Sequence, residues 1–415
     1  MFIAFVNKLS FIFCFLNFNN VIIVKEGEIF DGVLSEHTQS VTVRFAANAR
    51  GKALMGGTIE VDGNEIPQNG VVLTIDREIQ RIAESAIDAS GAECAAVVVI
   101  EIESGAVKAC VSRPAFNQND IAASLNDKNS PLINRAFLPF SVGSVFKPVV
   151  AASAIGSGIE NFEYCCTGSV TLNGVTFNCH KKDGHGVIDM QGAVANSCNT
   201  YFISLANLTG ADEITDTAKD FGFGSEIAFA EGMKSSSGNL PQKDELDSKA
   251  AVANISFGQG SLTATPVQIC SAFATIARGG VRVQPYLIEG RIDENGEYIQ
   301  VKNYGERRQI ISASTAMLLQ KFLKAVVTEG SGKRAKSDYV TSAGKTATAQ
   351  TGKTENGEEI YNAWFAGWFP ADEPKYAVAV LRENGGEGAV SCAPVFREIA
   401  EKTAEIRVYN SKKKQ

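Results

Sequence analysis

Residues 95–112 restrict the fold of this chain more than any other stretch, because they read as a buried β-hairpin. The run Ala95–Ile102 is almost entirely apolar, and an apolar run of this length between turn signals is typical of a strand. Glu103-Ser104-Gly105 supplies the turn, and the chain returns through Ala106–Ser112. The stretch therefore predicts two paired strands that are buried on at least one face.

A helix precedes this hairpin, and three more strands follow near the end of the chain. Asp76 is a suitable N-cap for the helix, in which apolar residues recur at positions i, i+3, i+4 and i+7. Residues 341–350 read as a strand of small residues and threonines, followed by a polar loop through Glu359. Residues 363–369 and 376–381 read as two further strands. We therefore predict an α/β fold with an antiparallel sheet of about five strands flanked by helices.

The bulk composition is that of an ordinary globular protein. The chain has 415 residues, of which 45% are hydrophobic and 20% are charged, and this length fits one large domain with a smaller one, or two to three ordinary domains. The net charge of -7 argues against nucleic acid as a partner, because nucleic-acid-binding proteins usually present a basic face. Nine cysteines are too few for a disulfide scaffold, and an odd number leaves at least one thiol unpaired in a monomer.

The first 24 residues are apolar and rich in phenylalanine, with Lys8 as their only charge. Their length suits a membrane span, although asparagines interrupt them and no small-residue cleavage site is evident. We expect residues 1–24 to form an uncleaved membrane anchor; a misassigned start and a buried segment are the alternatives. Residues 25–70 read as a short β-rich lead-in, and residues 409–415 as a charged tail.

Ser144 and Lys147 stand one helical turn apart at the start of an apolar helix. Residues three apart share a helix face, and the apolar run after Lys147 would bury the helix and desolvate the amine. Desolvation lowers the pKa of a lysine, so Lys147 is suited to act as a base toward the Ser144 hydroxyl. Gly143 leaves room for a substrate beside the serine. The same spacing at Ser411–Lys414 lies in the charged tail, where nothing desolvates the amine.

Three later segments carry further signals. Ser197-Cys198-Asn199 begins an apolar helical stretch and presents two polar side chains two residues apart, for which a helix cap is the simpler explanation. Thr265-Pro266-Val267-Gln268 combines an N-cap, a first-turn proline and a capping box, and Gly279-Gly280 ends that helix. Lys345-Thr346-Ala347 lies on the small-residue strand, where little side-chain bulk leaves room for a ligand.

The motifs Ser144-x-x-Lys147, Ser197-x-Asn199 and Lys345-Thr346-Ala347, in this order, resemble the three-motif signature of penicillin-binding proteins and serine β-lactamases. The wider sequence resembles the transpeptidase domain of class B, monofunctional penicillin-binding proteins, from near residue 71 to near residue 402. The resemblance implies the penicillin-binding-protein and β-lactamase type of α/β fold, with a transpeptidase domain over residues 71–408. The stretches that carry it are Leu73–Asp76, Gly143–Pro148, Gly258–Gln268 and Lys345–Gln350.

The resemblance also implies an activity and its catalytic residues. The chain would be a peptidoglycan D,D-transpeptidase that cross-links stem peptides through a serine acyl-enzyme and is inhibited by β-lactams. Ser144 would be the nucleophile that attacks the penultimate D-alanine, Lys147 its general base, and Ser197 a proton relay to the leaving amine. This chemistry requires no cofactor.

The remaining motif residues would bind the substrate. Asn199 would hydrogen-bond the substrate amide, and Lys345 would supply positive potential. Thr346 and Thr348 would bind the terminal carboxylate of the stem peptide or of a penicillin. The backbone N–H groups of Ser144 and Thr348 would form the oxyanion hole.

The sequence departs from the family pattern in two places. The third motif usually ends in glycine; we expect the methyl group of Ala347 to be tolerated. Residues 25–70 are much shorter than the usual N-terminal pedestal, of which they would be a remnant. A glycosyltransferase domain would not fit there either, so we expect no bifunctional enzyme.

The resemblance places the domain at the extracytoplasmic face of the bacterial membrane, anchored by the N-terminus, with membrane and cell-wall synthesis proteins as partners.

Three cysteines and a histidine form a second group of interest. Cys166, Cys179, His185 and Cys198 supply three thiolates and an imidazole, the ligand set of a closed structural zinc site. Because Cys198 stands between the two residues of the second motif, we expect it to point away from the cleft, where a metal would brace the loop. A Cys166–Cys179 disulfide is the competing interpretation for an extracytoplasmic protein, and free cysteines are the third.

Two other functions use the same fold. If water replaces the acceptor amine, the protein is a D,D-carboxypeptidase or a serine β-lactamase. A β-lactamase needs a group that activates the deacylating water, and the acid we consider for this role is Glu163, near the loop after the nucleophile helix. If the chemistry is lost, the chain is a non-catalytic β-lactam sensor or a cell-wall scaffold. The presence of all three motifs favours the transpeptidase over both.

Overall fold

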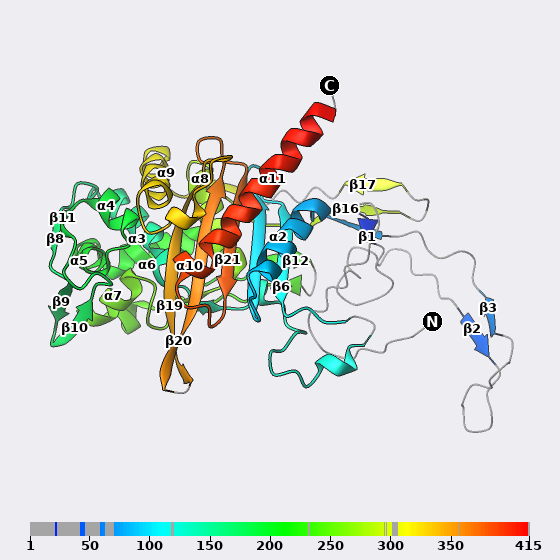
Figure 1. Cartoon of the computed structure of the whole chain (residues 1–415), viewed down its shortest axis with the longest axis horizontal. Helices are drawn as coiled ribbons and strands as arrows, with labels where there is room; N and C mark the ends of the chain where they lie inside the picture. The colour runs from blue at the N-terminus through cyan, green and yellow to red at the C-terminus, as the bar shows by residue number, and fades with distance from the viewer. Residues whose placement is uncertain are drawn as a thin grey trace.

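The structure is a computed structural model that describes residues 21–22, 42–45, 59–62, 70–117, 120–230, 233–293, 295, 297–300, 306–355 and 357–413. A five-stranded antiparallel sheet lies at its centre (Figure 1). Its strands, in spatial order, are β19 (Ala343–Glu355), β20 (Glu358–Phe369), β21 (Tyr376–Arg382), β5 (Ala95–Glu101) and β6 (Val107–Arg113). The predicted five-stranded sheet flanked by helices is therefore confirmed, and so is the hairpin over residues 95–112.

The two faces of the sheet bury alternate residues of the same strand. Along β5, Val97 and Val99 pack in the core that also holds residues of α2 (Arg77–Ala89) and α11 (Ala393–Lys413). Val98 and Ile100 point to the opposite face, which α8 (Pro266–Ala277) covers. A strand buried on both faces needs apolar residues at every position, which explains why the run shows no alternation.

The predicted helix ends are confirmed where a side chain caps them. Asp76 accepts hydrogen bonds from the backbone N–H groups of Glu78 and Ile79 at the start of α2. Thr265 accepts one from the Gln268 backbone, and the Gln268 side chain accepts one from the Thr265 backbone, which completes the capping box of α8. Gly279 and Gly280 follow its last residues with positive φ angles.

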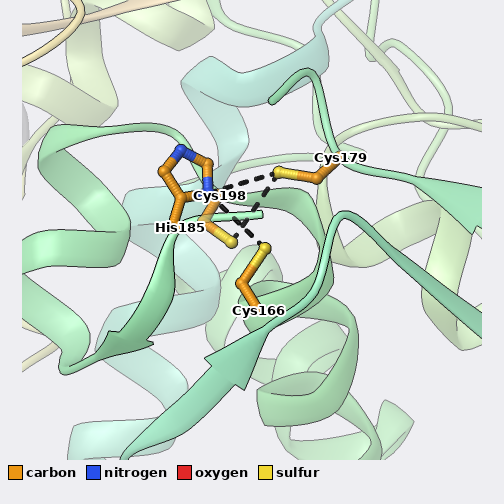
Figure 2. Close-up of side chains that lie close together, drawn as sticks. All are labelled: Cys166, Cys179, His185 and Cys198. Carbon is orange, nitrogen blue, oxygen red and sulfur yellow. Dashed lines mark hydrogen bonds between the residues drawn. The ribbon is translucent and has the colours of Figure 1, made fainter. Parts of the chain in front are cut away.

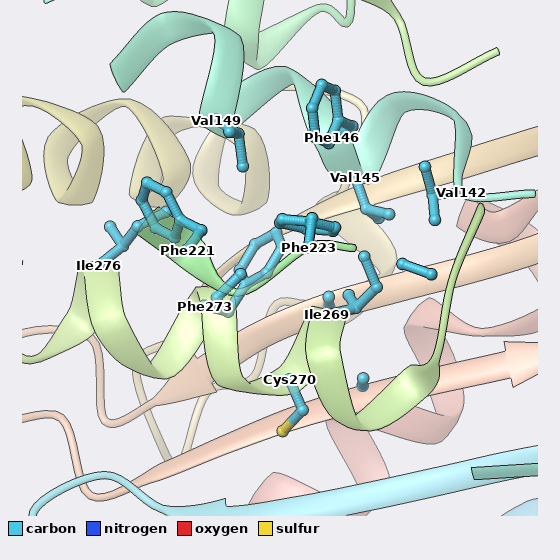
Figure 3. Close-up of a cluster of buried hydrophobic side chains, with 14 of the residues drawn as sticks. Val142, Val145, Phe146, Val149, Phe221, Phe223, Ile269, Cys270, Phe273 and Ile276 are labelled. Atoms are coloured by element: carbon cyan, nitrogen blue, oxygen red, sulfur yellow. The ribbon is translucent and has the colours of Figure 1, made fainter. Parts of the chain in front are cut away.

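Helix α8 joins the sheet to the segment that carries Ser144 (Figure 3). Its Cys270 faces the sheet and donates a hydrogen bond to the Val98 carbonyl. Its Phe273 points away from the sheet, into a cluster that includes Phe146 and Phe223. The rings of Phe146 and Phe223 pack edge to face, with their centroids 5.3 Å apart. The segment that carries Ser144 is therefore anchored on a buried apolar layer.

The other helices gather mainly beyond β19, at the opposite end of the sheet from β6 (Figure 1). The longer ones are α3 (Lys147–Gly156), α4 (Met190–Ala195), α5 (Asn199–Thr209), α6 (Ala211–Phe221), α7 (Lys249–Ser256) and α9 (Ala313–Thr328), with α10 (Gly388–Ser391) before α11. Short 3-10 helices cover Ala122–Ser124, Arg135–Phe137, Gly143–Phe146, Lys243–Leu246 and Lys333–Ala335.

The described residues also form several smaller sheets. β1 (Val21–Ile22), β4 (Gly70–Leu73), β16 (Ile288–Ile292) and β17 (Tyr298–Gln300) form a sheet of four strands. The two-stranded pairs are β2 (Thr42–Phe45) with β3 (Ile59–Asp62), β7 (Phe140–Ser141) with β14 (Thr263–Ala264), β8 (Tyr164–Cys166) with β11 (Gly186–Ile188), β9 (Ser169–Leu172) with β10 (Val175–Asn178), β12 (Ala228–Ala230) with β13 (Met233–Lys234), and β15 (Val281–Val283) with β18 (Arg307–Gln309).

Two predictions of irregular structure were wrong. The polar stretch through Glu359 is not a loop, because β19 and β20 remain paired as far as Glu355 and Glu358. The Gly, Asn and Cys content of residues 165–199 predicts a loop, but the structure has β9, β10, β11 and α4 in this stretch. Most side chains of both segments are exposed on the paired strands, so backbone pairing forms them without the apolar alternation that marks a half-buried strand.

The predicted membrane anchor over residues 1–24 lies outside the described residues, apart from Val21–Ile22. Among the helices that the structure does describe, none is both long and apolar enough to cross a bilayer. Most of the lead-in over residues 25–70 and the end of the charged tail also fall outside the described part, so the proposed domain boundaries remain predictions.

Candidate active site

Ser144 stands in a 3-10 turn, Gly143–Phe146, that leads directly into α3. Gly143 has a φ of 59° and donates its backbone N–H to the Gly258 carbonyl at 2.8 Å. A Cβ on Gly143 would lie 3.0 Å from the Ala349 Cβ on strand β19. Glycine is therefore required here for two reasons, the left-handed backbone and the close approach of the serine turn to β19.

Gly258 completes this contact from the other side. It has a φ of 76°, and a Cβ placed on it would overlap the Gly143 carbonyl. We predict that Gly258→Ala destabilises the fold by at least about 2 kcal/mol, since a left-handed non-glycine residue costs roughly 1–2 kcal/mol and the overlap adds to it. Urea unfolding measures this loss, and penicillin labelling should fall with it.

Gly91→Ala is the matched control for that variant. Gly91 has a φ of 68°, but no atom lies within 4 Å of a Cβ built on it. Its replacement should cost only the backbone term of about 1 kcal/mol. Equal losses in the two variants would contradict the proposed contact between Gly258 and the serine turn.

Lys147 is fully buried, and its amine lies at the centre of the site. Its Nζ lies 2.7 Å from the Ser197 carbonyl oxygen, 3.2 Å from the Ser197 Oγ and 2.7 Å from the Asn199 Oδ1. The protonated amine donates to all three oxygens, whereas the neutral amine donates to the carbonyl and the Oδ1 and can accept from the Ser197 hydroxyl. Burial lowers the pKa of Lys147 to about 7. The nearby Cys198 and Cys179 have the opposite, smaller effect and raise this pKa. The amine is therefore neutral in a large fraction of molecules at neutral pH, as a general base must be.

Ser197 and Asn199 flank the start of α5. Ser197 has a φ of 55°, a left-handed conformation that is uncommon for serine. The backbone N–H of Cys198 bonds to the Ala193 carbonyl at 3.0 Å, which closes the turn between α4 and α5. Asn199 offers its Oδ1 to Lys147 and donates its Nδ2 to the Asn178 carbonyl at 3.2 Å. The strained turn places both polar side chains around the lysine.

The third motif lies on β19, the edge strand of the central sheet. Lys345 is fully buried and donates to the Thr346 carbonyl at 3.1 Å. Burial holds its pKa well below the usual range, and the nearby Lys147 lowers it further. Thr348 is exposed. The structure therefore brings all three motifs together, with Lys147 close enough to Lys345 to lower its pKa.

Two residues that support this strand were missed by the sequence analysis. Ser331 shares a hydrogen bond with Thr346 at 3.2 Å between their hydroxyl oxygens, and it donates its backbone N–H to the Ala195 carbonyl. The backbone N–H of Gly388 donates to the Thr348 Oγ1 at 3.3 Å. In the sequence, the two glycines that flank Ser331 were the available sign of a close backbone contact at this serine. The structure contains that contact, since a Cβ on Gly330 would overlap the Ala195 carbonyl.

Cys166, Cys179, His185 and Cys198 form a compact cluster beside the site (Figure 2). Their sulfur atoms and the imidazole point toward one another, and all ligand atoms lie within 4.8 Å of each other. The three cysteines are buried. Cys166 and Cys179 are free thiols in the structure.

The family model and the relatives that match this chain agree with one another and cover most of its length. The family model described as the penicillin binding protein transpeptidase domain matches residues 95–401. The peptidoglycan D,D-transpeptidase MrdA of Acinetobacter baumannii is 29% identical over 79% of this chain and 53% of its own length. Stage V sporulation protein D of Bacillus subtilis is 28% identical over 83% of the chain and 54% of its own. This chain thus spans about half the length of these two relatives.

Solved structures show the same similarity. Penicillin-binding protein 3 from Mycobacterium tuberculosis has a TM-score of 0.73 and 28% identity, with 88% of each chain covered. The imipenem acyl-enzyme complex of penicillin-binding protein A from M. tuberculosis has a TM-score of 0.72 and 27% identity, over 80% of this chain and 79% of that one. The match to the family model covers both the central sheet and the elements that carry the three motifs.

Proposed function

Because this chain belongs to the penicillin-binding protein transpeptidase family, we propose that it is a serine D,D-transpeptidase that cross-links peptidoglycan stem peptides. The domain is of the class B type, as its similarity to MrdA and stage V sporulation protein D shows. One observation carries the proposal. A buried lysine with a pKa near 7 lies one turn after Ser144, contacts Ser197 and Asn199, and lowers the pKa of Lys345 on the edge strand β19.

The first half of the reaction forms an acyl-enzyme. The Ser144 oxygen attacks the carbonyl carbon of the penultimate D-alanine, and its proton passes to the neutral Lys147 amine. The bond from this carbon to the nitrogen of the terminal D-alanine breaks, and Ser197, which contacts Lys147, relays the proton to the leaving amine. The backbone N–H groups of Ser144 and Thr348 would stabilise the oxyanion.

In the second half, the amine of a neighbouring stem peptide attacks the ester. The new amide bond forms as the amine loses a proton, the ester bond to Ser144 breaks, and that proton returns to the serine oxygen. A penicillin would acylate Ser144 in the same way, without a leaving group, because its ring opens. Penicillin-binding protein transpeptidases use no cofactor, and any metal at the Cys/His cluster would be structural.

The free edge of β19 suits a peptide substrate. An edge strand has backbone N–H and C=O groups that an extended peptide can pair with. Lys345, Thr346 and Thr348 lie along this strand, where we assign them to the carboxylate end of the stem peptide, and we assign Asn199 to its amide. Such a substrate implies action at the extracytoplasmic face of the bacterial membrane, with residues 1–24 as anchor and membrane and cell-wall synthesis proteins as partners.

The pH profile of acylation tests the role of Lys147. Its pKa is lowered to about 7, so the amine is protonated and inactive below that pH and neutral above it. The rate of penicillin acylation should therefore rise with pH and reach half its maximum near pH 7. The ionisable groups around the amine are Lys345, Cys179 and Cys198. A rate that stays flat across neutral pH, or that rises only near pH 10, would contradict the assignment.

The function itself is tested with a synthetic stem pentapeptide ending in D-Ala-D-Ala and a second stem peptide as the amine acceptor. Mass spectrometry separates the cross-linked product from the hydrolysed tetrapeptide. We expect the cross-linked product from the wild type and neither product from Ser144→Ala. Hydrolysis alone would indicate a carboxypeptidase, rapid penicillin turnover a β-lactamase, and no reaction of either kind a sensor or scaffold.

A further inference from the structure

We propose that Ser331 is a positioning residue, which turns the Thr346 hydroxyl so that Thr346 donates its proton to the terminal carboxylate of the substrate. This inference rests on the proposed function, because that function assigns Thr346 and Thr348 to the carboxylate. Ser331 lies just beyond the end of α9, outside the three motifs. It therefore adds a fourth segment of the chain to the site.

The chemistry of the carboxylate decides which way these hydroxyls must point. An ionised carboxylate can only accept hydrogen bonds, whereas a threonine hydroxyl has one proton to donate and two lone pairs that accept. A hydroxyl that accepts a hydrogen bond from the protein keeps its own proton free for the ligand. A carboxylate site should therefore present each hydroxyl with a donor from another segment of the chain.

Both threonine hydroxyls have such a neighbour. Thr346 and Thr348 are two residues apart on β19, so their side chains lie on the same face of the strand. The Thr348 Oγ1 accepts the backbone N–H of Gly388 at 3.3 Å. The Thr346 Oγ1 lies 3.2 Å from the Ser331 Oγ, and either hydroxyl can be the donor in this pair. When Ser331 donates, the two threonines are arranged alike, and both protons are free for one ligand.

The Thr346 hydroxyl needs a fixed donor more than the Thr348 hydroxyl does. Thr346 is only 6% exposed, Ser331 is partly buried and Thr348 is exposed. Water can complete the hydrogen bonds of an exposed hydroxyl, whereas a buried polar group depends on partners within the protein. Loss of the Ser331 hydroxyl should therefore leave Thr346 free to turn its proton away from the ligand.

The backbone around Ser331 holds its side chain in this place. The Ser331 N–H donates to the Ala195 carbonyl at 2.9 Å. A Cβ on Gly330 would overlap the same carbonyl, so a glycine is needed for the two segments to come this close. Ala195 is the last residue of α4, two positions before Ser197. Ser331 thus connects the turn of the second motif to the strand of the third.

The donor to Thr348 is held by a close contact as well. A Cβ on Gly388 would overlap the carbonyls of both Ala347 and Trp364. The Gly388 donor is a backbone N–H, which a side-chain substitution leaves in place. Ser331 supplies its donor from a side chain, so it is the one of these two donors that variants can remove.

Carboxylate selectivity tests the role of Ser331. Ser331→Val should be acylated by penicillin G about 3- to 10-fold more slowly than the wild type, the scale of one hydrogen bond. The methyl ester of penicillin G should lose less, because its neutral carbonyl accepts a weaker hydrogen bond than a carboxylate does. An equal fold-loss with the acid and the ester, or no loss with either, would overturn the proposal.

Two further variants control for shape and for the substitution itself. Ser331→Thr has the shape of Ser331→Val but keeps a hydroxyl, so it should restore most of the penicillin G rate. Ser314→Val makes the same change at the exposed start of α9 and should leave both rates as they are. Equal losses in Ser331→Val and Ser331→Thr would show that shape matters rather than the hydroxyl, which would overturn the proposal.

A double-variant cycle tests whether Ser331 acts through Thr346. Thr346→Val removes the hydroxyl that reaches the carboxylate, so the addition of Ser331→Val should slow penicillin G acylation no further. The energies of two residues that act through one bond are not additive. Losses that multiply in the double variant would show that Ser331 reaches the ligand by itself, which would overturn its positioning role.

Noncovalent binding to Ser144→Ala separates this inference from the proposed function. This variant lacks the nucleophile, so a saturation-transfer NMR titration with penicillin G and its methyl ester measures affinity alone. Ser331→Val, added to Ser144→Ala, should weaken penicillin G binding by about 3- to 10-fold and methyl ester binding by less. If this difference appears while the wild type fails to cross-link stem peptides, only the proposed function is wrong. If the wild type cross-links and no difference appears, the role of Ser331 is overturned.

Discussion

Ser144→Ala should abolish covalent labelling by a fluorescent penicillin. The variant removes the only oxygen that, on this account, forms the acyl bond, while the turn and the buried layer under it stay intact because Ser144 is only half-buried. Loss of a serine nucleophile costs roughly a 10⁶-fold reduction in rate in a well-studied serine hydrolase. On a gel followed over an hour, the wild-type band should persist and the variant should show none.

Ser411→Ala is the control for this experiment. It alters another Ser-x-x-Lys spacing, which lies in the charged C-terminal segment. It should label as the wild type does, because nothing in the proposed site involves it. A band that survives in Ser144→Ala would show that the acyl group is carried by another residue.

Replacement of Lys147 should have the next largest effect. Lys147→Met keeps an unbranched side chain that is one atom shorter and removes the base, so the acylation rate should fall by about 10²–10⁴-fold, the usual contribution of general-base catalysis. The residual rate should also lose its rise near pH 7. Stopped-flow labelling at several penicillin concentrations measures the second-order rate constant.

Lys147→Arg separates the base from the hydrogen-bond donor. A guanidinium can still donate to Ser197 and Asn199, but it stays protonated at any pH used with proteins. We expect it to acylate as slowly as Lys147→Met. Lys402→Met is the matched control, because Lys402 begins a second Lys-Thr-Ala tripeptide on α11 and is paired with Glu398 at the surface. A fast Lys147→Arg variant would contradict the role of Lys147 as base.

Features encoded by neighbouring residues could be predicted from the sequence. The cap at Asp76, the capping box at Thr265 and the hairpin at residues 95–112 each depend on a few adjacent side chains, and the structure contains all three. The burial of Lys147 followed from the apolar run after it. These signals are local, so they survive without knowledge of the tertiary fold.

Contacts between distant segments could not be predicted in the same way. Gly258 supports the serine turn from 115 positions later in the chain, and Asn178 holds Asn199 through a backbone carbonyl that any residue could supply. The β19–β20 extension was read as a loop because its exposed side chains leave no apolar pattern. Sequence reasoning found the four residues of the Cys/His cluster, but not its link to Asn199 through Asn178.

The most direct test of the central claim is the intact mass of the full chain after incubation with penicillin G, followed by peptide mapping. The account predicts an increase equal to one whole penicillin molecule, since ring opening releases nothing, with the added mass on the peptide that contains Ser144. An unchanged mass, or an adduct on a peptide without Ser144, would contradict the assignment of this serine as the acyl-forming nucleophile.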